Sequence, residues 1–183
     1  MIYVISGMVR AGTSMMAEAL KQGGIPLLYD ENVPNTDPED DFPHNTYDLP
    51  TQHDMAQNPE SLNGCAIKLM VSSVCAIPKQ YRNNVKVIWM TRKVKSVLMS
   101  VKLAAEHRGQ TREIPTPREA RRVERFWSKR VIEYGFNVMI VKYEECVKHP
   151  ASVMAQVNDF LQYPDFDLGA AVAVVDPKKW RQR

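Results

Sequence analysis

The sequence lacks any apolar run long enough to cross a membrane. A transmembrane helix needs about 20 consecutive apolar residues, and no run in the 183 residues approaches that length. Cysteine is also scarce: Cys65, Cys75 and Cys146 form no C-x-x-C pair, so neither a zinc site nor a disulfide framework is indicated. The start of the chain has no signal-peptide pattern. We therefore expect a cytoplasmic protein with free thiols and no membrane partner.

Lysine and arginine are absent between Lys21 and Lys68. That stretch contains nine acidic residues, which leaves 24 cations against 12 acids in the rest of the chain. Six of the 12 prolines fall in residues 25–60, which show no sustained periodicity. We predict an acidic, proline-rich insert here, and both a lid over an acceptor site and a mobile surface loop are consistent with it. The basic remainder favours an anionic ligand.

Residues 1–24 combine a strand, a glycine loop and a helix. The apolar run MIYVIS at residues 1–6 predicts a buried strand, and apolar residues at helical spacing predict a helix over residues 15–22. At such a junction the loop amides and the positive end of the helix point at one spot, where an anion can bind. The sequence thus predicts an anion site at residues 7–14. An ordinary turn between strand and helix is the alternative.

The loop differs from the ATP-binding P-loop, G-x-x-x-x-G-K-[ST], at one position. Gly7, Gly12 and Ser14 fit this pattern, but Thr13 occupies the lysine position. That lysine carries positive charge to the β- and γ-phosphates, so its absence argues against an ordinary kinase or ATPase. Arg10, inside the loop, is the candidate for the missing cation.

Apolar runs and helical periodicities alternate along the rest of the chain. Strands are predicted at residues 65–71, 85–91 and 137–145, and helices at 94–102, 117–134, 149–161 and 167–175. This alternation predicts an α/β fold with a parallel sheet of four to five strands and helices on both faces. With 183 residues and 44% apolar content, one domain over residues 1–183 is expected. Ligands of such folds bind at the carboxyl ends of the strands.

Two cations stand at predicted strand ends. Lys68 lies inside the apolar run at residues 65–71, where a buried ammonium needs a partner; a side chain that snorkels to solvent is the alternative. Arg92 follows the strand at residues 85–91, where a kinase-type protein would place an aspartate for magnesium. Ser100 lies two helical turns beyond Arg92, so both can meet one phosphate. We expect one crevice to collect the loop, Lys68 and Arg92.

These motifs resemble those of the sulfotransferase family. The family's loop, P-[KR]-S-G-T-[ST], grips the 5′-phosphosulfate of 3′-phosphoadenosine 5′-phosphosulfate (PAPS), and here the residues from Val9 to Ser14 read V-R-A-G-T-S. Val9 replaces the usual proline and Ala11 the usual serine. The family also binds the 3′-phosphate with an arginine and a serine at the spacing of Arg92 and Ser100. The resemblance implies a three-layer P-loop (nucleoside-kinase-like) fold.

The resemblance further implies a metal-independent transfer of a sulfuryl group from PAPS to a hydroxyl or amine. The acceptor, whether a small molecule, a glycan or a peptide, is left open, as is the oligomeric state. The implied cofactor-binding residues are Arg10, Ala11, Gly12, Thr13, Ser14, Arg92 and Ser100. Arg10 and Lys68 are the implied catalytic cations, because they would stabilise charge in the transition state.

The general base cannot be carried over from the family. Many members have a histidine two residues after the strand-end lysine, and Met70 stands at that position here. Three residues of the acidic insert are the candidates to replace it: Asp48 first, His44 second and His53 third. Asp48 falls near a glutamate of the bacterial members.

Two other functions remain open. A divergent P-loop enzyme, such as a small-molecule kinase, would use ATP and magnesium, whereas a non-catalytic nucleotide-binding or nucleic-acid-associated protein would account for Met70. The helix at residues 117–134 bears cations at Arg118, Arg121, Arg122, Arg125, Lys129 and Arg130. A solvated basic face is the default interpretation, because nucleic-acid binding would need exposed aromatics between the cations. The packed face of this helix is predicted at Ala120, Val123, Trp127 and Val131, with Phe126 beside it.

Overall fold

A computed structural model gives the structure of the protein. It describes residues 1–28, 59–107, 109 and 113–175. Most of the predicted acidic insert, with all three candidate bases His44, Asp48 and His53, lies outside the described residues. The end of the chain after residue 175 lies outside them as well.

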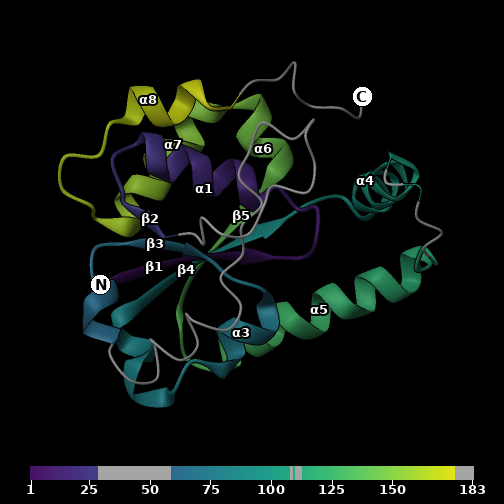
Figure 1. The fold of residues 1–183 in the computed structure, drawn as a ribbon, viewed down its shortest axis with the longest axis horizontal. Helices are drawn as coiled ribbons and strands as arrows, with labels where there is room; N and C mark the ends of the chain where they lie inside the picture. Colours follow the sequence, from purple (N-terminus) through teal and green to yellow (C-terminus); the bar gives the residue numbers. More distant parts are fainter. Residues whose placement is uncertain (29–58, 108, 110–112, 176–183) are drawn as a thin grey trace.

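Five strands of the described chain form one parallel sheet (Figure 1). They are β1 (Ile2–Gly7), β2 (Leu27–Leu28), β3 (Ala66–Lys68), β4 (Val85–Thr91) and β5 (Asn137–Lys142). Their order across the sheet is β2-β3-β1-β4-β5, and every neighbouring pair is parallel. The chain leaves the central β1 first toward β2 and β3, and later returns across it to β4 and β5. Such a reversal opens a crevice at the carboxyl ends of the strands, so the segment after β1 borders it.

Helices cover both faces of this sheet, as the sequence predicts (Figure 1). One face carries α1 (Thr13–Gln22), α6 (Tyr143–Lys148), α7 (Pro150–Leu161) and α8 (Leu168–Ala173). The other carries α3 (Val71–Ala76), α5 (Pro117–Glu133) and two 3-10 helices (Pro59–Leu62 and Lys79–Asn84), while α4 (Val94–His107) lies beyond the strand ends. Side chains of β1 alternate between the two cores: Tyr3 and Ile5 pack on the first face, Ile2 and Val4 on the second. Both sets are apolar, which a parallel sheet buried on two sides requires.

The structure differs from the sequence prediction at several elements. The strand predicted at residues 65–71 is wrong beyond Lys68, because the chain turns there into α3, whose Val74 is fully buried. An apolar run alone cannot distinguish a buried strand from the buried side of a short helix. The strand predicted at 137–145 ends at Lys142, where α6 follows directly. The two-residue strand β2 lies where no element was expected, since two residues show no periodicity.

The helix predicted at residues 117–134 is present as α5, but its packed face is smaller than predicted. Ala120 and Val131 are buried, whereas Val123 and Phe126 are 42% and 49% exposed. The amino-terminal half of α5 extends past the ends of the strands (Figure 1). That half therefore has less of the sheet beneath it than the carboxyl-terminal half.

The described residues contain neither a candidate membrane-spanning helix nor a disulfide. None of their helices has both the length and the apolar character that crossing a bilayer requires. The three cysteines are free. Only Cys146 is buried, and this burial raises the pKa of its thiol to about 12.

We predict that Thr116→Ala lowers the free energy of unfolding by about 1 kcal/mol, the usual contribution of such a cap. Thr116 and Glu119 form a capping box at the start of α5: the Thr116 hydroxyl accepts from the Glu119 amide at 3.3 Å, and the Glu119 carboxylate accepts from the Thr116 amide at 2.8 Å. Urea unfolding measures the loss. The control is Ser128→Ala on the same helix, whose hydroxyl donates only to the Arg125 carbonyl, and equal losses would contradict the capping role.

Candidate active site

The phosphate loop joins the central strand to α1. β1 ends at Gly7, and α1 begins at Thr13. Within the loop the Ala11 amide donates to the Met8 carbonyl at 3.0 Å, which closes a tight turn. Arg10 and Gly12 have left-handed backbones, with φ of 65° and 95°. The structure thus has the predicted strand, loop and helix, and the amino-terminus of α1 follows the carboxyl end of β1.

Gly12 contacts the end of a strand far away in the sequence. A Cβ atom on Gly12 would collide with the ring of Tyr143. Tyr143 is the first residue of α6 and directly follows β5. Two features therefore require glycine at this position: the positive φ and the ring of Tyr143 that packs against the backbone.

Lys68 is held at the loop rather than snorkelling to solvent. It is the last residue of β3 and only 7% exposed. Its Nζ donates to the Ser14 hydroxyl, with 3.2 Å between Nζ and Oγ. This contact supplies the partner that a buried ammonium requires, and it joins the end of β3 to the first turn of α1.

Arg10, Arg92 and Ser100 form a second group on the other side of β1. The Nε of Arg10 donates to the Ser100 hydroxyl at 3.0 Å, and Nη1 of Arg92 donates to the Arg10 carbonyl at 3.1 Å. Arg92 follows β4, and Ser100 is a buried residue of α4. The predicted pair of Arg92 and Ser100 is therefore brought together through Arg10.

The environment of Arg92 disfavours its charge. Burial lowers the pKa of the guanidinium; Tyr143 and Glu144 act against this lowering, and the charge of Arg10 adds to it. Half-buried cations of like sign are expensive to keep together unless anionic groups lie close to them. The arrangement is thus suited to a ligand that carries several negative charges.

Two residues of this site were missed from the sequence. The guanidinium carbon of Arg92 lies 4.3 Å from the ring centre of Tyr143, a cation–π contact. Glu144 is buried, and its Oε1 accepts from the Lys93 amide at 2.9 Å, next to Arg92. Lys68 and Arg92 were selected because each is a polar residue at a predicted strand end. The same rule selects Tyr143 and Glu144 once β5 is known to end at Lys142.

The remaining predicted site residues differ in what the structure says of them. Thr13 opens α1 and is partly exposed. The side chain of Ala11 is fully buried, so only its backbone is available to a ligand of the loop. Met70, where the resembled family has its base, caps the start of α3 and is 45% exposed. His44, Asp48 and His53 fall outside the described residues, and their roles stay predictions.

Known proteins share the sequence pattern and the fold of this chain. The family model described as "Sulfotransferase domain" matches residues 3–168. The structure is similar to the crystal structure of a sulfotransferase from Alicyclobacillus acidocaldarius, with a TM-score of 0.52, 16% identity and 98% of both chains covered. It is also similar to the sulfotransferase domain from the curacin biosynthetic pathway, with a TM-score of 0.57, 15% identity, and 96% of this chain and 77% of that chain covered. These likenesses confirm the predicted three-layer P-loop fold. No curated protein sequence matches the chain.

We predict that Gly12→Ala destabilises the protein more than Gly64→Ala does. Both glycines have a positive φ, 95° and 82°, so both substitutions carry backbone strain of roughly 1–2 kcal/mol. Only at Gly12 does the new methyl group meet the Tyr143 ring; the space at Gly64 is open. Thermal unfolding of the two variants measures the difference. Equal shifts in melting temperature would show that Tyr143 yields freely and does not fix the loop.

Proposed function

The chain belongs to the sulfotransferase domain family, and we propose that it transfers a sulfuryl group from PAPS to a hydroxyl or amine of its acceptor. The observation that carries the proposal is the meeting of Arg10, Lys68 and Arg92 at one glycine loop, through Ser14 and Ser100. PAPS presents a 5′-phosphosulfate and a separate 3′-phosphate. Two cationic groups on either side of β1 fit a ligand with two separate anionic ends.

Each group receives a role in this proposal. Arg92 and Ser100 bind the 3′-phosphate, as an arginine and a serine at this spacing do in the resembled family. The backbone amides of the loop, with Thr13 and Ser14, bind the 5′-phosphate at the amino-terminus of α1. Arg10 lies between the two ends, because its side chain reaches Ser100 while its backbone belongs to the loop.

The reaction breaks one bond and forms one bond. The acceptor oxygen or nitrogen attacks sulfur, and the bond between sulfur and the 5′-phosphate oxygen breaks, which leaves 3′-phosphoadenosine 5′-phosphate (PAP) with the electron pair. Arg10 and Lys68 stabilise the negative charge that grows on the sulfuryl and phosphate oxygens. The proposal needs no metal ion. The acceptor proton goes to a base, for which Asp48, His44 and His53 remain the candidates in that order.

A specific observation also supports a second function. Met70 has no group that can take a proton, and it stands exposed where a base is usual in the family. A non-catalytic protein that binds PAP or a related nucleotide would fit the same loop and cations. A divergent kinase is a further alternative, which ATP binding that depends on magnesium would favour. PAP binding combined with sulfuryl transfer separates the proposed enzyme from both.

We expect Arg92→Ala to weaken PAP about tenfold or more while leaving AMP almost unaffected. A hydrogen bond to a charged group contributes roughly 1.5–3 kcal/mol, and only PAP has the 3′-phosphate that Arg92 is proposed to bind. Calorimetry with EDTA present measures both affinities without metal. Lys95→Ala is the control, an exposed cation in the first turn of α4, three residues after Arg92. Equal losses for PAP and AMP would remove Arg92 from the 3′-phosphate site.

Arg10→Ala is expected to lower kcat about a hundredfold, well beyond its effect on PAP affinity. The charge of Arg10 is most useful when the leaving phosphate gains negative charge in the transition state. Transfer from PAPS to a surrogate phenol gives kcat, and calorimetry gives the affinity of the same variant. A variant that loses affinity alone would make Arg10 a plain phosphate ligand.

A further inference from the structure

Exposed arginines gather on one helix of the described chain. Arg118, Arg121, Arg122, Arg125 and Arg130 are exposed residues of α5. The other described arginines, Arg10, Arg82 and Arg92, are partly buried and hydrogen-bonded. The described cations that are exposed outside α5 are all lysines: Lys21, Lys79, Lys93, Lys95, Lys102, Lys142 and Lys148. Arginine is thus used inside the protein where it makes directed contacts, and its concentration on α5 needs its own explanation.

Four of these arginines form a continuous stripe. Arg118, Arg121, Arg122 and Arg125, here called the arginine stripe, recur at spacings of three and four residues and therefore share one helix face. The stripe extends over roughly 10 Å at about 1.5 Å per residue. In the part of the chain that the structure describes, none of the four side chains has a hydrogen bond or an ion pair. Neighbouring charges of one sign repel each other at these spacings.

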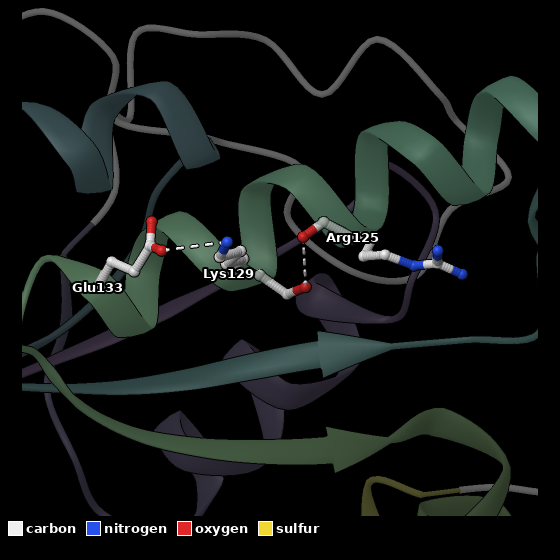
Figure 2. A network of polar contacts seen from close by, with 4 residues as sticks. Arg125, Lys129 and Glu133 are labelled. Carbon is white, nitrogen blue, oxygen red and sulfur yellow. Dashed lines mark hydrogen bonds and ion pairs between the residues drawn. The ribbon is translucent and has the colours of Figure 1, made fainter.

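The acidic residues of α5 do not neutralise the stripe. Glu119 is engaged in the capping box at Thr116. Glu124 is half-buried, and burial followed by repulsion from Glu144 raises the pKa of its carboxyl group. Glu133 pairs with Lys129 at 3.4 Å, one turn from Arg125, whose guanidinium points away from that pair along the helix (Figure 2). The anion that would compensate the stripe therefore has to come from outside α5.

The surroundings of the stripe favour a protein as that anion. Val123 and Phe126 are exposed on the same helix. Phe126 lies one helical turn from both Arg122 and Arg130. Aromatic residues beside arginine, with few lysines, are enriched in protein interfaces. A membrane surface fits less well, because Ala120 and Val131, the apolar face that would enter a bilayer, are buried inside the protein. Base stacking fits less well too, because Arg130 lies 5.2 Å over the Phe126 ring and Trp127 packs against it at 5.1 Å.

We propose that α5 is the docking surface for an acidic protein partner, whose carboxylates pair with the arginine stripe and whose apolar residues contact Phe126. The amino-terminal half of α5 passes the carboxyl ends of the strands, where the candidate site lies (Figure 1). Glu124, in the middle of the helix, is close enough to Glu144 for the two charges to interact. A partner on α5 therefore sits beside the site.

The test uses a synthetic helical peptide with glutamates at spacings of three and four residues and one leucine beside them. Fluorescence anisotropy measures its affinity for the whole protein. The triple variant Arg121→Gln, Arg122→Gln and Arg125→Gln is expected to bind at least tenfold more weakly. The control variant Lys79→Gln, Lys102→Gln and Lys148→Gln removes the same charge and is expected to change affinity less than twofold. Equal losses in the two variants would overturn the proposal, since general charge attraction would then explain the binding.

Two further measurements separate a shaped contact from other polyanions. Arg121→Lys, Arg122→Lys and Arg125→Lys keeps the charge but loses the planar fork, so we expect at least threefold weaker peptide binding; unchanged affinity would contradict docking through arginine. Heparin, duplex DNA and phosphatidylserine vesicles serve as rival probes. If one of them binds more tightly than the peptide and loses affinity in the stripe variant, the proposed acidic protein is wrong and the partner belongs to the class of that probe. An unchanged melting temperature in thermal unfolding shows that the stripe variants remain folded, whether or not the protein binds PAP.

Discussion

Arg92 is held between the backbone of the phosphate loop and the ring of Tyr143, and this contact joins the ends of three strands. Its Nη1 donates to the Arg10 carbonyl, so the loop after β1 is tied to the end of β4. The ring of Tyr143 lies under the guanidinium and against Gly12, which brings in the end of β5. Because the strands are parallel and their register is fixed by two apolar cores, these ends cannot move independently. The site is therefore as rigid as the sheet beneath it.

The same contacts explain how cations can be kept at the site. The charges of Arg10 and Arg92 repel each other. Arg10 and Lys68 each donate a hydrogen bond to a serine, Ser100 and Ser14 respectively. Glu144 adds a buried carboxylate next to Arg92 and accepts the Lys93 amide. An anion that contacts several of these cations at once would lower the remaining free energy of repulsion between them. The proposed anion would bind only the folded arrangement, which links its binding to folding stability.

The sequence predicts this site best where one strong local signal suffices. The apolar run before Gly7 and the helical period after Ser14 define the loop, and strand-end position identifies Lys68 and Arg92. Tyr143 and Glu144 were not predicted as site residues. Apolar and β-prone residues continue through Val141 and Tyr143, so the sequence pattern does not show where β5 ends and α6 begins. The exposure of Val123 was not predicted for another reason. Helical periodicity shows which residues share a face of the helix. Only the fold shows that α5 extends past the ends of the strands, so that Val123 is exposed.

The proposed donor site and the proposed docking surface are therefore subject to different constraints in the fold. The residues proposed to hold PAPS stand at the ends of β1, β3 and β4, whose positions the packing of the sheet determines. The arginine stripe stands on the solvent side of α5, where a substitution disturbs neither core. Such a surface can change its partner while the phosphate loop stays intact. A docking specificity that depends on surface charge is thus separable from a proposed chemistry that depends on strand ends, because the two depend on different parts of the fold.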